Sequence, residues 1–208
     1  DGYNARMTAG FCWDWSLPNS DGTLVDDVVI GNYKRPWNAK PEAGRLAPGI
    51  PKATLWANKP NGINQVGCIY TAQGFEFDYV GVIFGEDLVY DFDRQEWKGD
   101  KSKSSDSSVK KSSDRFIDLV KNTYRVLLTR GMKGCYVYFI DKDTERFFKS
   151  RMEKAVQQEA AGEAKADDSK SILDEVEDEK KYREYLPVMS LKAVATSFGR
   201  EEYVEQTG

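Results

Sequence analysis

Five short apolar runs punctuate the first 140 residues and predict β-strands. They occupy residues 9–15, 24–30, 65–70, 77–84 and 135–140. Several of these runs are continuously apolar instead of alternating between apolar and polar positions, which is typical of strands covered on both faces in a parallel sheet. The pattern therefore predicts a sheet with two buried faces.

A helix is predicted between the last two strands, over residues 114–129. A second helix should begin near residues 143–144, whose side-chain oxygens can cap free backbone amides, and Phe147, Phe148 and Met152 give it an apolar stripe. The order strand, helix, strand, helix predicts an α/β domain with a mostly parallel sheet and helices on both faces. The first helix has apolar side chains at three- and four-residue spacing, namely Phe116, Leu119, Val120, Tyr124 and Leu127.

Two segments interrupt this order, and a third follows it. Residues 99–113 are rich in Ser and Lys and have no hydrophobic face, which predicts a mobile surface insertion. Residues 31–62 contain five of the seven prolines and four glycines, which predicts a long irregular excursion. The last part of the chain is strongly charged and should form a helix that is broken near Gly162. We therefore expect one domain over residues 1–150 and a charged helical appendage and tail over residues 151–208.

Composition excludes several classes of function. The 208 residues carry 30 Lys and Arg against 34 Asp and Glu, so the net charge of −4 gives no global sign of nucleic-acid binding. The chain has no histidine and only three widely spaced cysteines, which excludes Ser–His and Cys–His nucleophile systems and argues against a structural zinc site. Separated cysteines in odd number favour a reducing compartment, and no apolar stretch is long enough to cross a membrane. We therefore expect a cytoplasmic protein with no metal site of its own and no membrane partner.

The first candidate for chemistry is the segment at residues 68–85, where a buried strand ends in a polar turn. Gly74 lies in that turn, and because it lacks a Cβ atom the backbone can bend sharply and approach a ligand. Gln73 and Glu76 flank it, and both side chains can hydrogen-bond a sugar hydroxyl or a nucleic-acid backbone. A tight turn between strands, with Glu76 in solvent, explains the same residues, and on spacing alone that interpretation is favoured.

The second candidate is the segment at residues 122–134, where an amphipathic helix ends at Thr129-Arg130-Gly131. Gly131 is a natural residue for leaving a helix. Arg130 and Lys133 should therefore project at a sheet edge, where open α/β sheets bind ligands, and an arginine there can reach a phosphate held by another domain. The alternative is a basic helix end that offsets the helix dipole. This segment alone supports the two interpretations equally.

Taken together, the two segments resemble two motifs of superfamily-one helicases. Residues 73–78, Gln-Gly-Phe-Glu-Phe-Asp, are similar to their fifth motif, and the helix that ends in Thr-Arg at residues 129–130 is similar to their sixth. The stretches YTAQGFEFDYVGVI and NTYRVLLTRGMKG most resemble the Schlafen group-three-like DNA/RNA helicase domain of bacterial ATPases, as do ARMTAGFCWDWS and QVGCIY. The resemblance covers about residues 1–150 and implies the C-terminal RecA-like lobe of an ATP-driven helicase or translocase.

The resemblance implies a role for each matching residue. In that superfamily ATP lies between two RecA-like lobes, where Glu76 would bind the ribose, and Gln73 and Gly74 would couple the nucleotide to the nucleic-acid track. Arg130 would be the arginine finger, because a planar guanidinium stabilises the negative charge that spreads over the γ-phosphate oxygens during phosphoryl transfer. Related helicases often have histidine three residues before the motif glutamine, where this chain has Tyr70. The secondary candidates are Arg125, Thr129 and Lys133.

A phosphate-binding loop is absent from this sequence. The nearest approach is residues 44–52, where Ile50 and Pro51 separate the second glycine from the lysine, and the prolines remove backbone donors. The resemblance therefore implies that ATP and magnesium are held mainly by an N-terminal ATPase lobe of the same parent protein, expected upstream, and that single-stranded DNA or RNA is the other partner. This chain alone should not hydrolyse ATP. The alternative is a non-catalytic RecA-like module for protein docking or regulation; the acidic appendage and the absent loop fit it, whereas the retained Gln73, Glu76 and Arg130 do not.

Two weaker features have plain structural interpretations. Phe11, Trp13 and Trp15 alternate along a predicted strand and should share one face, and a place in the core is favoured over a platform for stacking bases. The acidic pairs at residues 26–27 and 86–87 should be solvated and not bind a metal, because adjacent residues of a strand point to opposite faces.

Overall fold

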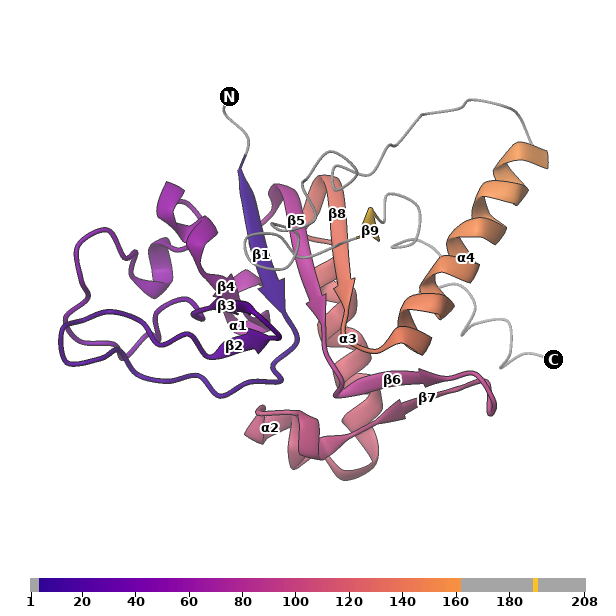
Figure 1. Ribbon diagram of the computed structural model, residues 1–208, viewed down its shortest axis with the longest axis horizontal. Helices are drawn as coiled ribbons and strands as arrows, with labels where there is room; N and C mark the ends of the chain where they lie inside the picture. Colours follow the sequence, from indigo (N-terminus) through magenta and orange to yellow (C-terminus); the bar gives the residue numbers. More distant parts are fainter. Residues whose placement is uncertain (1–3, 162–188, 191–208) are drawn as a thin grey trace.

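The computed structural model of the chain describes residues 4–161 and 189–190, and its centre is a five-stranded sheet with the order β4–β1–β5–β8–β9. Its parallel strands are β4 (Val66–Gly67), β1 (Ala5–Ala9), β5 (Phe77–Phe84) and β8 (Gly131–Phe139), and β9 (Met189–Ser190) pairs antiparallel to β8. Figure 1 shows β1, β5 and β8 running downward together, so their carboxyl ends meet at the lower edge of the sheet. The predicted α/β class with a parallel sheet is confirmed.

The first predicted strand is misplaced along the sequence. The strand β1 ends at Ala9, and residues 10–15 form a loop in which the indole N–H groups of Trp13 and Trp15 donate to the carbonyl oxygens of Val29 (3.2 Å) and Asn38 (2.7 Å). The aromatic side chains therefore do not alternate on one strand face. They pack partly buried against the smaller core, and Phe11 has its ring centroid 5.7 Å from that of Trp37.

The predicted strand at residues 65–70 is cut short by a helix. The strand β4 covers only two residues, and α1 (Ile69–Ala72) follows at once. The cause is a local cap: the Thr71 hydroxyl accepts a hydrogen bond from the backbone N–H of Cys68 (3.1 Å), which closes the first turn of the helix. The chain thus changes direction within one residue of leaving the sheet.

One face of the sheet packs against the helices. Alternate residues of β5, namely Val80, Val82 and Phe84, belong to the larger core, together with the buried faces of α3 (Phe116–Leu128) and α4 (Lys142–Ala161). The prediction for α3 is confirmed to within two residues. In α4 the predicted apolar stripe is also present, but the cap is Asp141, whose carboxylate accepts from the backbone N–H of Thr144 at 2.6 Å.

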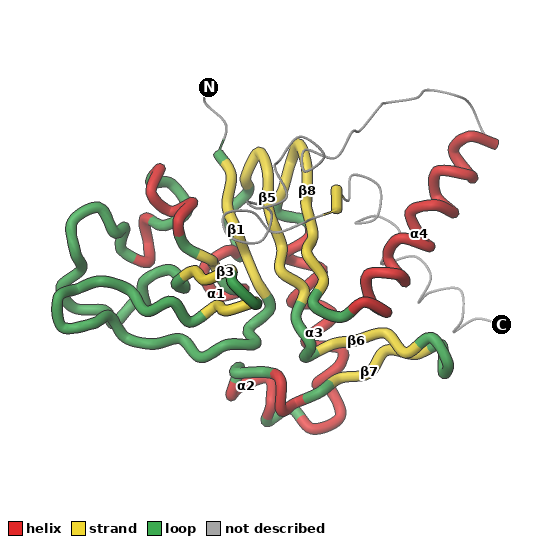
Figure 2. Tube along the Cα trace, in the orientation of Figure 1, coloured by secondary structure: helices red, strands yellow, loops and turns green. Residues whose placement is uncertain are grey.

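The opposite face of the sheet is covered by loops and a short hairpin. Ile83 of β5 and Tyr138 of β8 belong to a second core with the hairpin β2 (Val28–Ile30) and β3 (Tyr33–Arg35). Among the described residues no helix contributes to this second core, in contrast to the predicted helices on both faces. Figure 2 shows the hairpin β2–β3 flanked by loops, while the segment with the 3-10 helices Ala53–Leu55 and Pro60–Asn64 contributes Trp56 and Ala57 to the larger core.

A second hairpin extends from the carboxyl edge, and residues 99–113 fold against the domain behind it. The hairpin consists of β6 (Leu88–Asp91) and β7 (Glu96–Gly99) and was not predicted. Residues 99–113 were predicted to be a mobile insertion, but they form a 3-10 helix (Lys101–Lys103) and α2 (Ser107–Lys110), and another 3-10 helix (Ser113–Arg115) leads into α3. The buried carboxylate of Asp106 caps α2 by accepting hydrogen bonds from the backbone N–H groups of Ser108 and Val109. Polar capping therefore gives order to this Ser- and Lys-rich segment.

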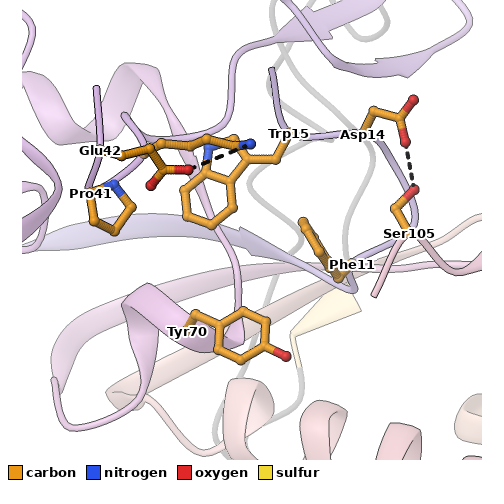
Figure 3. Close-up of a pocket in the computed structure, with 8 residues that line it drawn as sticks. Phe11, Asp14, Trp15, Pro41, Glu42, Tyr70 and Ser105 are labelled. Carbon is orange, nitrogen blue, oxygen red and sulfur yellow. Dashed lines mark hydrogen bonds and ion pairs between the residues drawn. The ribbon is translucent and has the colours of Figure 1, made fainter. Parts of the chain in front are cut away.

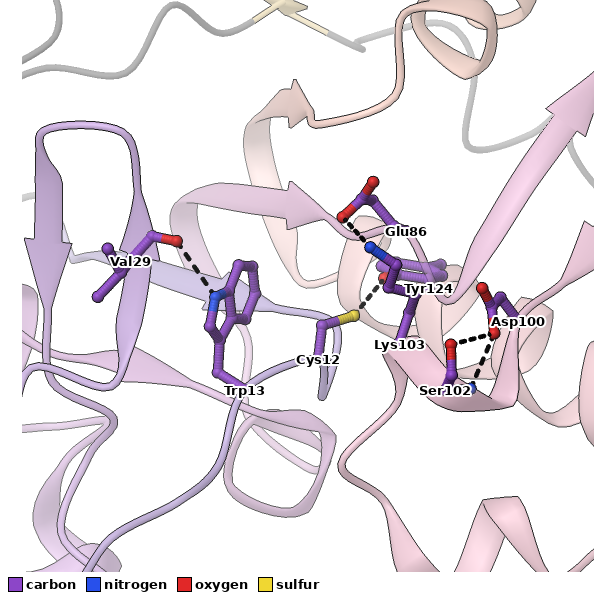
Figure 4. A network of polar contacts seen from close by, with 8 residues as sticks. All are labelled: Cys12, Trp13, Val29, Glu86, Asp100, Ser102, Lys103 and Tyr124. Atoms are coloured by element: carbon purple, nitrogen blue, oxygen red, sulfur yellow. Dashed lines mark hydrogen bonds and ion pairs between the residues drawn. The ribbon is translucent and has the colours of Figure 1, made fainter.

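A buried polar cluster joins α3 to the carboxyl end of β5. The Tyr124 hydroxyl donates to Asp87 Oδ1 (2.7 Å) and accepts from the backbone N–H of Gly85 (2.8 Å), and the Cys12 sulfur lies 3.9 Å from it (Figure 4). Asp87 is 3% exposed, so the expectation of a solvated carboxylate is wrong at this position. Burial raises the pKa of Asp87, because the charged form loses its hydration.

No helix among the described residues is long and apolar enough to cross a membrane. The helix α4 runs without interruption past residue 150, and the predicted break near Gly162 lies outside the described residues.

Candidate functional site

Two adjacent parallel strands bring the two sequence motifs to the amino-terminal edge of the sheet. The strands β5 and β8 pair directly, with Phe77 opposite Gly131. Glu76 and Arg130 are the residues immediately before that pair, and the backbone N–H of Phe77 donates to the carbonyl oxygen of Arg130 at 2.8 Å. Backbone pairing alone therefore places Glu76 and Arg130 beside each other at one edge.

The turn before β5 presents polar groups to solvent. Gly74 has a φ of +86°, a conformation that residues with a Cβ rarely adopt, and no atom lies within 4 Å of the position of a Cβ. Gln73, Gly74 and Glu76 are all exposed, while Phe75 between them packs partly buried against the larger core. Among the described residues Glu76 forms no hydrogen bond or ion pair. A partly buried phenyl ring thus anchors a turn whose carboxylate is available to a ligand.

The guanidinium group of Arg130 is held by oxygen atoms that carry no charge. Its Nε donates to the carbonyl oxygen of Val126 (3.0 Å), Nη1 to that of Phe75 (3.4 Å), and Nη2 to the hydroxyl of Thr129 (3.1 Å). No carboxylate within the described part of the chain pairs with it. Arg130 therefore bridges the end of α3 and the turn before β5 while its positive charge has no acidic partner.

The three secondary candidates differ in their surroundings. Thr129 supports Arg130, because its hydroxyl accepts from the guanidinium and donates to the carbonyl oxygen of Val126 at 3.0 Å. Arg125 is half-buried on α3 and donates to Asn122 Oδ1 at 2.7 Å. Lys133 forms an ion pair of 2.7 Å with Asp78, and this hydrogen bond lowers the pKa of the Asp78 carboxyl group. Lys133 is thus occupied by a neighbour on β5.

A close approach of two backbone segments shapes the edge next to Arg130. A Cβ atom at Gly131 would lie 2.2 Å from the carbonyl oxygen of Gly134, which is a severe clash. The register between β5 and β8 shifts between Phe77 and Tyr79, so β8 bulges at residues 132–133. Bulges of this kind re-aim side chains and are frequent beside functional sites.

Tyr70, which stands where related helicases often have histidine, lies near the first residue of α1, whereas Gln73 follows its last residue. Its hydroxyl donates to Asp106 Oδ2 at 2.7 Å, and desolvation together with this carboxylate raises the pKa of Tyr70 to about 12. Tyr70 therefore stays protonated at neutral pH, and its ring is 49% exposed at the carboxyl edge of the sheet.

Sequence reasoning missed Arg6, a buried arginine within β1. It is 4% exposed and donates to the carbonyl oxygens of Trp56 (3.0 Å) and Lys59 (2.7 Å) and to Asn4 Oδ1 (2.7 Å). Burial lowers its pKa. These bonds tie the loop at residues 56–59 to the sheet, and no local motif around Arg6 indicates partners fifty or more residues away.

The described residues contain neither a cluster of metal ligands nor a phosphate-binding loop. The described residues contain no group of three or more Cys, Asp or Glu side chains that could hold a metal ion. Residues 44–52 form a loop that is followed by a 3-10 helix of three residues, without the long helix whose amino end would hold phosphates.

Comparison with known proteins identifies the family of this chain. A family model described as Schlafen group 3, DNA/RNA helicase domain, matches residues 1–141, which is more than half of the sequence. The chain belongs to the Schlafen group 3 DNA/RNA helicase domain family.

A curated relative of this Schlafen-type domain is the uncharacterized protein YPL245W of Saccharomyces cerevisiae, 33% identical over 99 residues. The match covers 44% of the chain and 22% of that relative, so the chain spans only a minor part of the relative's length. No solved structure matched the chain with significance.

Proposed function

We propose that this Schlafen-type domain, over residues 1–150, acts as the C-terminal RecA-like lobe of an ATP-driven DNA/RNA helicase or translocase. It completes a nucleotide site whose phosphate-binding loop and magnesium ligands lie on a separate N-terminal lobe of the same parent. The observation that carries the proposal is the pairing of Phe77 with Gly131, which sets Glu76 and Arg130 side by side at one edge. Residues 151–208 are a charged appendage to this lobe.

Arg130 acts in the proposed site as the arginine finger. Its guanidinium is oriented by three neutral oxygen acceptors and has no carboxylate partner among the described residues, so its charge can be directed to a phosphate. When the lobes close, the planar group stabilises the negative charge that develops on the γ-phosphate oxygens. Thr129 acts as a positioning residue through its bond to Nη2.

Glu76 binds the ribose in the same arrangement. An exposed carboxylate accepts hydrogen bonds from both hydroxyl groups of a ribose, and no described residue competes for it. Gln73 and Gly74 lie between this carboxylate and α1, whose other end reaches the carboxyl edge of the sheet. They are therefore placed to link nucleotide binding to a single strand of DNA or RNA at that edge.

The test uses the intact parent protein with single substitutions. We expect Arg130→Ala to retain ATP binding and to lose roughly 10³-fold or more of the hydrolysis rate, because an arginine finger contributes about that much. Arg130→Lys should restore little of it, since an ammonium group lacks the planar fork. Glu76→Ala should instead weaken ATP binding, by about 10-fold or more, because hydrogen bonds to a charged group are lost.

The matched control is Arg94→Ala, in the turn between β6 and β7, far from the amino edge and 69% exposed in its side chain. It should leave binding and hydrolysis unchanged. If Arg130→Ala hydrolyses ATP at the normal rate, the finger assignment is wrong. If single-stranded nucleic acid also fails to stimulate the ATPase of the parent, a docking or regulatory module becomes the better description.

A further inference from the structure

A second feature lies at the carboxyl edge, opposite the proposed nucleotide site. Residues that follow β1, β3, β4 and β7 line an open cavity of about 310 Å³ (Figure 3). Three aromatic rings, those of Phe11, Trp15 and Tyr70, form its apolar walls, and the charged side chains of Asp14, Lys40 and Glu42 also line it. We call this cavity the carboxyl-edge pocket. Neither the proposed arginine finger nor the ribose contact makes use of it.

The three rings are held in place without a ligand. Phe11 meets Trp15 edge-on at 6.1 Å and 84°, and it meets Tyr70 in the same way at 6.2 Å and 86°. The indole N–H of Trp15 donates to the carbonyl oxygen of Asn38, and the Tyr70 hydroxyl is bonded to Asp106. Tyr70 nevertheless keeps half of its surface exposed. A planar aromatic group can therefore stack in the pocket with little cost of ordering the rings.

The charges at the rim select what can enter. Asp14 accepts one hydrogen bond, from the Ser105 hydroxyl at 3.1 Å, and Glu42 forms a long ion pair of 3.9 Å with Lys40. Carboxylates only accept hydrogen bonds, and they repel phosphate groups. Lys40 also lines the pocket and offsets the charge of Glu42, which leaves Asp14 as the carboxylate without a cationic partner among the described residues. Asp14 therefore favours a ring that carries N–H donors on its edge, with any attached phosphate outside the pocket.

Cationic side chains for such a phosphate follow directly along the chain. Ser105 lines the pocket, and the next residue, Asp106, caps α2. Lys110 and Lys111 at the end of this short helix are exposed, and their side chains form no hydrogen bond or ion pair with the described residues. Aromatic walls next to exposed lysines are typical of sites for single-stranded nucleic acids.

We propose that the carboxyl-edge pocket takes one unpaired nucleobase of a single strand, stacked against Tyr70 and Trp15, and that Asp14 makes guanine the preferred base. Guanine presents two adjacent donors, N1–H and the N2 amino group, that match the two oxygens of a carboxylate. Adenine and cytosine set an acceptor nitrogen beside their single amino group, and thymine and uracil set carbonyl oxygens beside N3–H. The inference rests on the proposed function in that it takes the partner to be nucleic acid.

The experiment measures binding of the 208-residue chain to fluorescently labelled oligothymidines that carry one central guanine, adenine or cytosine, by anisotropy at low salt. We expect the guanine oligonucleotide to bind about 5-fold or more tightly than the others, since a good paired contact discriminates by at least that factor. Tyr70→Ala should weaken binding of all oligonucleotides by about 5- to 150-fold, and Tyr70→Phe, which retains the ring, should bind nearly as well as the unchanged chain.

The base preference has its own variant and control. Asp14→Asn should abolish the preference for guanine while the chain still binds, because an amide offers one acceptor and one donor in place of two acceptors. Asp26→Asn removes the same charge from an exposed carboxylate outside the pocket and should leave both affinity and preference unchanged. Circular dichroism of each variant shows that the fold is retained.

Three outcomes would overturn the inference. The chain could bind all oligonucleotides equally well with Tyr70→Ala, in which case bases do not use the pocket. Millimolar choline could displace the oligonucleotides without any base preference, which would assign the pocket to a methylated cation. The unchanged chain could fail to bind any oligonucleotide, and the proposed nucleotide site would then still stand or fall by ATP hydrolysis in the Arg130 variants.

Discussion

The hydroxyl group of Tyr124 offers a direct test of the buried polar cluster behind the sheet. Tyr124→Phe removes one oxygen atom and nothing else, because the ring is fully buried and stacks on Phe84 with centroids 3.7 Å apart. The substitution therefore creates almost no cavity. What it removes is the donor to Asp87 and the acceptor for the backbone N–H of Gly85.

The expected loss of stability follows from these two bonds. A hydrogen bond to a carboxylate contributes about 1.5–3 kcal/mol, and a buried N–H left without an acceptor costs about 1–3 kcal/mol. Allowing for partial relaxation, we expect the free energy of unfolding to fall by about 2–4 kcal/mol. For a domain of this size that corresponds to a decrease of roughly 5–15 °C in Tm.

Urea denaturation at neutral pH, followed by circular dichroism, measures this loss. The matched control is Tyr138→Phe on β8, whose half-buried ring packs in the smaller core and whose hydroxyl forms no hydrogen bond with the described residues. The control should change the free energy of unfolding by less than about 0.5 kcal/mol. A loss below about 1 kcal/mol for Tyr124→Phe would show that the cluster does not stabilise the fold as argued.

Two further predictions concern charge and backbone packing. Burial raises the pKa of Asp87 above its unfolded value of about 4, so the native state binds more protons than the unfolded state between these two pKa values. The free energy of unfolding should therefore fall as the pH rises from about 4 through the folded pKa. Asp87→Asn should flatten this part of the pH profile, measured by urea titrations, and an unchanged slope would assign the pH dependence to other groups. Gly131→Ala should lower the free energy of unfolding by roughly 1–3 kcal/mol, because the added Cβ meets the Gly134 carbonyl oxygen at 2.2 Å; wild-type stability in this variant would refute the close packing of the bulge.

The parts of the fold that could be predicted are those with a continuous local pattern. The strand β5 is apolar from Tyr79 to Phe84 and mostly buried on both faces, and α3 shows one buried face at helical spacing. The strand β1 has neither pattern, since Arg6 and Thr8 are buried within it and find their acceptors far along the chain, at Trp56 and Gly81. The apolar run after it was mistaken for the strand because its aromatic side chains pack from a loop.

The same distinction separates the two edges of the sheet. Glu76 and Arg130 each lie in a local motif just before a strand, and parallel pairing of those two strands brings them to a common edge. That edge is the amino-terminal one, whereas the general rule for open α/β sheets, on which the sequence expectation relied, refers to the carboxyl edge. The carboxyl-edge pocket has no such signature, because its walls come from residues 11–15, 40–42, 70 and 105. Its geometry depends on three bonds that join distant loops: Trp15 to Asn38, Tyr70 to Asp106 and the backbone of Ser105 to Phe11. A pocket assembled in this way becomes visible only once the loops that follow separate strands have been placed against one another, and the rings of Phe11 and Trp15 both pack against the smaller core and line this pocket.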